Sequence, residues 1–196
     1  MKKLLITAFE PFGGEKINPS WEAVVRLPDT LHGYELTKLC LPVVFGEAAE
    51  LAIGKAEELG ADVLLFVGQA GGRRAITPEL VAINLRYASI PDNKGNQPTD
   101  EPIIDGDSTA YFSTLPVRKM AEAIQSSGIP SAVSYSAGAY VCNEVLYRAL
   151  SHFSKVPTRV GFIHVPYSEE QGKEPALSLT DMTSVLATAI RHLDDN

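Results

Sequence analysis

The chain alternates short, apolar, β-rich segments with longer stretches of helical periodicity, and this alternation limits the fold more than any other feature. The expected strands cover 3–9, 35–42, 62–67, 131–135 and 159–165. The expected helices begin at Asn18-Pro19-Ser20 and then cover 45–59, 116–128, 140–154 and 180–193. Apolar strands that alternate with helices are typical of a mostly parallel sheet covered on both faces. We therefore predict an α/β fold.

The length and composition of the chain fit a single compact domain covering residues 1–196. With 45% hydrophobic residues, a chain of 196 residues can bury a sizeable core. The formal charge is −7, and the lysines and arginines form no basic block, which disfavours a nucleic-acid partner. No apolar stretch approaches the roughly 20 residues needed to cross a bilayer, so we expect no membrane partner. The short apolar run at 4–9 fits a buried first strand better than a secretion signal.

The chain has two cysteines, Cys40 and Cys142, which are too few for a disulfide scaffold. A reactive thiol survives best in a reducing compartment, so we expect a cytoplasmic protein. Cys40 lies within an expected strand and is assigned to packing.

Cys142 lies where an apolar segment has ended, Gly138 allows a turn, and a helical pattern begins. The first backbone N–H groups of a helix have no partner within the helix, so they favour a thiolate over a thiol and can face an oxyanion. Position alone is equally compatible with a small buried side chain near a helix start. Cys142 is therefore a candidate nucleophile, which needs a base and a group that orients the base.

Among the four histidines, His164 is the candidate base. It ends the apolar strand 160–163, and in open α/β sheets the carboxyl ends of the strands line the ligand crevice to which Cys142 is also delivered. A satisfied histidine in the core is an equal alternative for this position. The other histidines have ordinary explanations in a turn or near helix ends: His32, His152 and His192.

Glu79 is the candidate carboxylate. It follows the glycine-rich turn 68–74 and directly precedes the alternating segment 80–85, so its side chain is expected to be partly buried and to need a partner. An imidazolium is one candidate partner, and three arginines are the others: Arg73, Arg74 and Arg86. The spacing of the glycines differs from those of the dinucleotide and P-loop motifs, so we expect no phosphate cradle here.

A long polar loop at 88–107 follows an expected additional strand at 79–87. Loops of this length within a compact domain are usually functional or disordered. A lid, a contact between subunits and a solvated segment without a role are all compatible with the sequence.

Several separated blocks, in order along nearly the whole chain, resemble the pyroglutamyl peptidase I family of cysteine peptidases, also called pyrrolidone carboxyl peptidases. The blocks are TAFEPFGG at 7–14 with NPS at 18–20, GQAGGR at 68–73, TPELVAIN at 77–84, IPDNKGNQP at 90–98, SAGAYVCN at 136–143 and FIHVP at 162–166. The resemblance implies an open three-layer α/β/α sandwich and a cytosolic enzyme that uses neither a metal nor an organic cofactor. It also implies a homotetramer or a homodimer.

The same resemblance implies a Cys-His-Glu triad, which falls on Cys142, His164 and Glu79. The implied reaction removes an N-terminal pyroglutamyl residue from a peptide through a thioester acyl-enzyme. The substrates are then N-terminally pyroglutamylated peptides, whose flat, neutral lactam suits an apolar pocket with polar edges. The residues that the resemblance assigns to this pocket are Phe9, Phe12, Asn18, Gln69, Ile90, Tyr140 and Val141. Burial statistics alone favour core packing for the two phenylalanines.

Three positions depart from the family pattern. Ser89 and Leu80 occupy positions where the family usually has arginine, and Ala139 stands where threonine is common. The loss of nearby cations bears on the ionisation of Glu79, so efficiency and substrate range are open. Two alternatives follow: a weakly active or inactive relative that binds a pyroglutamyl-like lactam, and a thiol amidase that acts on another small amide.

Overall fold

The centre of the computed structural model, which describes residues 1–195, is a six-stranded sheet. The strand order is β2, β3, β1, β4, β8, β5. The sheet strands are β1 (Lys2–Phe9), β2 (Thr30–Leu31), β3 (Tyr34–Leu41), β4 (Val63–Gln69), β5 (Thr77–Pro78) and β8 (Arg159–Val165). The four long strands are parallel, whereas the two short edge strands, β2 and β5, run antiparallel to their neighbours. The predicted mostly parallel sheet is confirmed.

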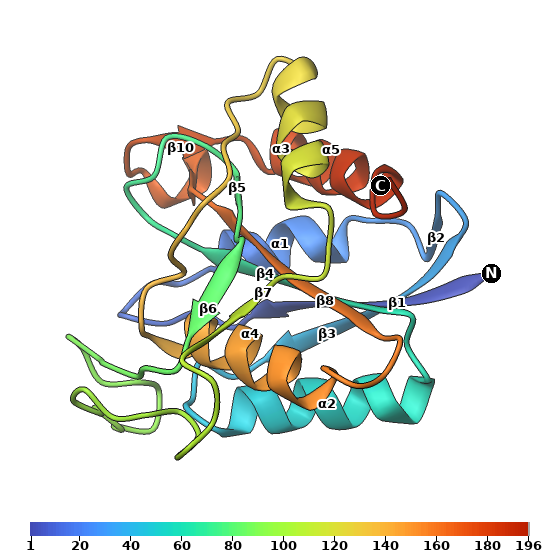
Figure 1. Ribbon diagram of the computed structural model, residues 1–196. Helices are drawn as coiled ribbons and strands as arrows, with labels where there is room; N and C mark the ends of the chain where they lie inside the picture. The colour runs from blue at the N-terminus through green and yellow to red at the C-terminus, as the bar shows by residue number, and fades with distance from the viewer. Residues whose placement is uncertain (196) are drawn as a thin grey trace.

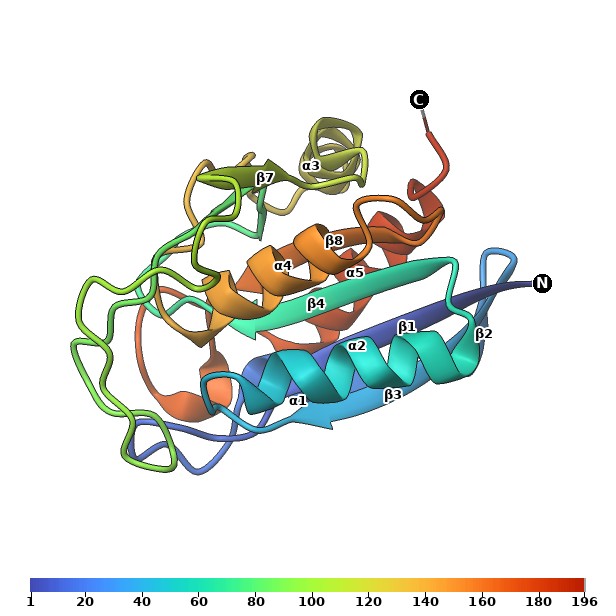
Figure 2. The same ribbon diagram turned by 60° about the horizontal axis from the view of Figure 1, so that its bottom comes forward.

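Helices cover both faces of this sheet, which gives a three-layer α/β/α sandwich (Figures 1 and 2). One face carries α1 (Pro19–Val25), α3 (Val117–Ser126) and α5 (Leu179–Arg191), and the other carries α2 (Glu47–Leu59) and α4 (Val141–His152). The smaller elements are β6 (Val81–Ile83), β7 (Ala110–Phe112), β9 (Tyr167–Ser168), β10 (Ala176–Leu177) and the 3₁₀ turn Glu169–Gln171. No helix within residues 1–195 is long and apolar enough to cross a membrane.

The two cores follow from the alternation of side chains along the central strands. On β1, Leu4 and Ile6 enter the core beneath α1 and α5, whereas Leu5 and Phe9 enter the core beneath α2 and α4. Successive side chains of a strand point to opposite faces, so a strand that is apolar at every position must be covered on both sides. Burial of each large side chain stabilises the fold by about 1.5–3 kcal/mol.

Local signals set the predicted ends of two helices. The Asn18 side chain accepts a hydrogen bond from the backbone N–H of Ser20 at 3.1 Å, and Pro19 occupies the first position of α1, where no donor is lost. Helix α2 ends at Gly60, whose φ of 59° lies in the left-handed region. Both ends confirm the sequence prediction.

Two predicted strands differ in the structure. Residues 131–135 form no strand of the sheet: they run beside 76–80 through isolated bridges at Ser131 and Ser134. The Ser131 hydroxyl bonds the carbonyl of Ile76, and such side-chain bonds compete with a regular ladder. The predicted strand at 79–87 shortens to β6, which pairs with β7 outside the central sheet, because the N–H of Leu85 turns back to the carbonyl of Ile83.

The long loop is tied to the segments that follow β1 and β3. Asp92 is 5% exposed, and its carboxylate accepts hydrogen bonds from the backbone N–H of Phe45 at 3.0 Å and of Asn96 at 2.9 Å. The Asn93 amide donates to Glu10 Oε1 at 2.7 Å. These bonds fix one corner of the loop at the carboxyl edge of the sheet, beside the ends of β1 and β3. Whether the loop also acts as a lid or a subunit contact stays a prediction.

Candidate active site

The candidate residues gather at the carboxyl ends of the parallel strands. Phe9 ends β1, Gln69 ends β4, and His164 lies one residue before the end of β8. Cys142 is the second residue of α4, which packs over β8 on the face shared with α2. The edge of an open α/β sheet predicted from the sequence is therefore where these residues meet.

The Cys142 sulfur lies against β4 at the level of His164. A Cβ atom built on Gly68 would lie 3.1 Å from Cys142 Sγ and 2.6 Å from the ring of Phe162. Gly68 is the register partner of His164 in the parallel pair β4–β8, so the Cβ direction at position 68 and the imidazole share one face of the sheet. The structure thus brings the thiol and the imidazole to adjacent places on the same face.

His164 and Glu79 form a buried pair. The Nδ1 atom of His164 lies 2.7 Å from Glu79 Oε1, and the two residues are 3% and 0% exposed. The pairing of β5 with β8 sets this contact, because the backbone N–H of Glu79 donates to the carbonyl of Phe162 at 2.9 Å. Since Nδ1 contacts the carboxylate, Nε2 is the ring nitrogen available to another partner.

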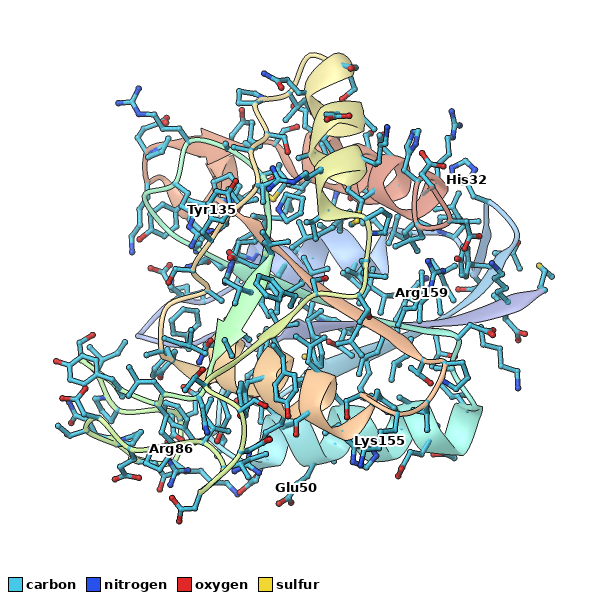
Figure 3. The ribbon with its side chains drawn as sticks, in the orientation of Figure 1. His32, Glu50, Arg86, Tyr135, Lys155 and Arg159 are labelled. Carbon is cyan, nitrogen blue, oxygen red and sulfur yellow. The ribbon has the colours of Figure 1, made fainter. Side chains whose placement is uncertain are left out.

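Arg73 completes the environment of Glu79. Its Nη1 lies 2.7 Å from Glu79 Oε1, and its Nη2 donates to the carbonyl of Ser136 at 3.0 Å. The partners left open by the sequence are thereby resolved: His164 and Arg73 both contact the carboxylate. Arg86, labelled in Figure 3, instead pairs with Glu101 and with Glu144. Arg74 is exposed.

Burial dominates the protonation states of the site. It raises the pKa of the Cys142 thiol to about 12, with the negative charge of Glu79 acting in the same direction and Arg73 opposing it. Burial also lowers the pKa of His164, and the contact with Glu79 offsets this only in part. For Glu79, burial alone would raise the pKa, but the interactions with His164, Ser134 and Arg73 outweigh it and the pKa is lowered. At neutral pH the thiol and imidazole are therefore neutral and the carboxylate is charged. The preference for thiolate expected from the helix start is outweighed by burial.

A narrow cavity of about 10 Å³ lies beside the thiol. It is lined by Phe9, Phe12, Asn18, Val43, Gln69, Tyr140, Val141 and Cys142. Six of the seven residues assigned to the pocket from the sequence are present. Ile90 is outside this lining: it is 44% exposed, and its Cδ1 lies 3.8 Å from a Cβ built on Gly13.

Val43 also lines the cavity and was not predicted from the sequence, although a signal was available. Val43 lies two residues after the end of β3, at the same carboxyl edge that identified His164. Phe9 is both a core residue and a lining residue, so the two readings of this side chain are compatible.

Aromatic rings form one wall of the cavity. The ring centroid of Tyr140 lies 6.3 Å from that of Phe12 and 5.3 Å from that of Phe45. The Tyr140 hydroxyl donates to the carbonyl of Pro91 at 3.1 Å, which links this wall to the long loop. The wall is therefore fixed by packing and by a hydrogen bond.

The polar edges of the cavity are partly occupied by structural bonds. Asn18 accepts from Ser20 and donates to the carbonyl of Glu10 at 3.0 Å. The side-chain oxygen of Gln69 accepts a hydrogen bond from Gln171 at 3.0 Å. These bonds hold both residues in place at the rim of the cavity.

The other histidines lie away from the site. His152 contacts Glu57 and His192 contacts Asp195, both at the surface. His32 lies near β2 at the opposite end of the sheet (Figure 3). Within residues 1–195, no group of three or more His, Cys, Asp and Glu side chains is arranged to hold a metal ion.

A thiol at a helix start beside a buried imidazole–carboxylate pair, at the carboxyl edge of an α/β/α sandwich, is the arrangement of a cysteine hydrolase. Residues 2–193 match the pyroglutamyl peptidase family. The chain belongs to this family of cysteine peptidases.

Similar proteins support this assignment over the full chain. The pyrrolidone-carboxylate peptidase of Levilactobacillus brevis is 49% identical over 197 residues, with 96% of each chain covered. Pyrrolidone-carboxylate peptidase 1 of Caldanaerobacter subterraneus is 47% identical over 195 residues, again with 96% of each chain covered.

Solved structures agree with the fold. The crystal structure of pyroglutamyl peptidase I from Bacillus amyloliquefaciens is 44% identical and superposes with a TM-score of 0.93, covering 98% of this chain and 97% of that chain. A variant of pyrrolidone carboxyl peptidase from Pyrococcus furiosus is 42% identical, with a TM-score of 0.92 and 97% of each chain covered.

Proposed function

We propose that this chain removes an N-terminal pyroglutamyl residue from peptides, with Cys142 as nucleophile, His164 as general base and acid, and Glu79 as the group that orients the imidazole. The observation that carries the proposal is the 2.7 Å contact between His164 Nδ1 and Glu79 Oε1, buried beside the thiol. Membership in the pyroglutamyl peptidase family supports the choice of substrate.

The acylation step begins from a neutral thiol and a neutral imidazole. His164 takes the Cys142 proton as the sulfur attacks the carbonyl carbon of the pyroglutamyl bond, and the charged Glu79 stabilises the imidazolium that forms. The C–N bond then breaks, the proton passes from His164 to the departing amine, and a thioester remains on Cys142.

Deacylation reverses the roles of the same groups. His164 accepts a proton from water, the water oxygen attacks the thioester carbonyl, and the C–S bond breaks. The imidazolium returns its proton to the sulfur, which releases pyroglutamate and restores the thiol. The backbone N–H of Cys142, at the start of α4, is the proposed donor to the oxyanion in both steps.

The cavity lining supports selection of a neutral lactam. The proposed lactam ring contacts the carbon-rich surfaces of Phe9, Phe12 and Tyr140, which must move apart to admit it because the cavity is narrow. A charged α-amine would lose its hydration there without an opposite charge to compensate, so an ordinary N-terminus is rejected.

We further propose that the chain acts as one catalytic domain in the cytoplasm, as a homodimer or a homotetramer. Two free cysteines support a reducing compartment. Light scattering on the purified protein tests the number of subunits.

The experiment compares pyroglutamyl, prolyl and glutaminyl arylamides with the wild-type protein and with Cys142→Ala. Release from the pyroglutamyl compound alone, and loss of release in the variant, supports the proposal. Full cleavage by Cys142→Ala contradicts the mechanism. Preference for another amide indicates a different thiol amidase, and saturable lactam binding without release indicates a binding protein.

A further inference from the structure

Arg73 contacts two segments that carry the site: 77–79, and the segment that leads into α4. Its guanidinium bonds Thr77 on β5, the carboxylate of Glu79, and the carbonyl of Ser136 in the segment that leads into α4. The fork of an arginine suits such a role, because its donors are held in one plane and point in different directions. One side chain therefore couples the position of the acid to the segment that delivers Cys142.

Arg73 and His164 contact the same carboxylate oxygen of Glu79. Both His164 Nδ1 and Arg73 Nη1 lie 2.7 Å from Glu79 Oε1. The second oxygen, Oε2, is buried and has no hydrogen-bond partner among residues 1–195. A fully buried carboxylate in this setting depends strongly on each remaining partner, because charge without compensation is costly in an apolar surrounding.

Arg73 also supplies the positive charge that faces the reacting pair. The titratable groups around it are Glu79 after β5, His164 on β8 and Cys142 on α4, with Tyr140 facing the thiol from the helix start. Among the described residues, no other lysine or arginine forms an ion pair with Glu79. The charge of Arg73 lowers the pKa of both His164 and Cys142.

From this geometry we infer that Arg73 is a positioning residue: it locks Glu79 to the segment before Cys142 and sets the pH range in which the thiol and imidazole exchange a proton. This inference rests on the proposed function of the triad. If the positive charge is removed, the pKa values of His164 and Cys142 both rise. Activity requires a neutral imidazole on the acid side and a thiol proton on the basic side, so both limbs of the pH–rate profile move to higher pH.

The test uses Arg73→Gln, Arg73→Lys and the neighbouring exposed Arg74→Gln as a matched control. For each, kcat and KM for a pyroglutamyl arylamide and the rate of alkylation of Cys142 are measured against pH. We expect Arg73→Gln to lower kcat roughly tenfold or more with a smaller change in KM, and to move the acid limb and the alkylation midpoint upward by about one pH unit. Arg73→Lys restores the limb positions but only part of kcat, because the charge returns without the fork. Arg74→Gln matches the wild type.

Limb positions separate this role from a merely structural one. If Arg73→Gln folds and loses rate with unchanged limbs and an unchanged alkylation midpoint, the inference is wrong. If Arg73→Gln does not fold, Thr77→Val decides, because this variant removes an anchor of the guanidinium and keeps the charge. A smaller upward move of both limbs of the pH–rate profile supports the inference. Wild-type kcat and wild-type limb positions in both Thr77→Val and Arg73→Lys overturn it. Cys142→Ala is measured in parallel. Retained cleavage by that variant refutes the proposed triad itself, whereas an inactive Cys142→Ala with unshifted Arg73→Gln refutes the inference alone.

Discussion

The sulfur of Cys142 occupies the space that Gly68 leaves open on β4: a Cβ at position 68 would lie 3.1 Å from Sγ. The same Cβ would lie 2.6 Å from the ring of Phe162, which packs 4.4 Å from the His164 ring, centroid to centroid. The absence of one side chain therefore allows the thiol to approach the strand pair that carries the imidazole.

Replacing Gly68 by alanine is expected to displace Cys142 or Phe162 and to reduce kcat/KM for a pyroglutamyl arylamide by about tenfold or more. Overpacking of this kind typically costs about 1–3 kcal/mol of stability, so urea unfolding is measured alongside the kinetics. Gly54→Ala on α2 is the matched control, because a Cβ there meets nothing within 4 Å. Wild-type kinetics in Gly68→Ala would contradict the close approach.

Replacing Glu79 by glutamine removes the charge and nearly preserves the shape. We expect kcat to fall by roughly 10²- to 10⁴-fold, because the imidazolium loses its stabilising carboxylate. The Glu79 contact raises the pKa of His164, so its removal lowers that pKa further and moves the acid limb to lower pH. This direction is opposite to that expected for Arg73→Gln. Glu101→Gln, at an exposed ion pair with Arg86, is the control. An acid limb that stays in place would argue against the Glu79–His164 contact in solution.

The Cys142 thiol should make the fold less stable at alkaline pH. Above its ordinary pKa of 9.0 the unfolded chain loses the thiol proton, whereas the folded protein retains it up to about 12. The folded state then binds more protons, so its stability falls as pH rises, by up to about 1.4 kcal/mol per pH unit for one group. Urea unfolding of Cys40→Ala is compared with that of Cys40→Ala/Cys142→Ala, so that Cys142 is the only thiol that differs. Parallel stability curves for the two proteins would refute the raised pKa.

Val43 and Ile90 provide a test of which side chains line the pocket. Val43 lines the cavity in the structure, whereas Ile90 was assigned to it from the resemblance and lies outside. The loss of apolar contact worth about 1 kcal/mol raises KM roughly fivefold. We therefore expect KM to rise roughly fivefold in Val43→Ala and to change less than about twofold in Ile90→Ala. The reverse order would mean that the loop carrying Ile90 closes over bound substrate.

Much of this architecture is predictable from local sequence. The alternation of strands and helices gives the layers, and Asn18 and Gly60 carry signals that act over only a few residues. His164 and Cys142 could be assigned to one edge of the sheet because the ends of parallel strands converge there. These inferences need no knowledge of how distant segments pack.

Contacts between distant loops lie beyond such reasoning. The sequence offered several partners for Glu79, and only the folded chain selects Arg73 and His164 together. The space at Gly68 depends on how α4 lies over β4, which no local pattern specifies. Residues 131–135 have strand-like composition, yet they run alongside residues 76–80 at the edge of the sheet through isolated bridges only. Tyr135, labelled in Figure 3, is 62% exposed. Tertiary pairing therefore outweighs the strand propensity of this segment.

The most direct test of the account is to trap the acyl-enzyme. The protein is mixed with a pyroglutamyl ester, quenched in acid within one turnover, digested and mapped by mass spectrometry. We predict one pyroglutamyl group in thioester linkage on the peptide that contains Cys142, and none on the peptide that contains Cys40. The central claim would be contradicted if the ester were cleaved while both cysteines stayed unmodified, or if the pyroglutamyl group were found on Cys40.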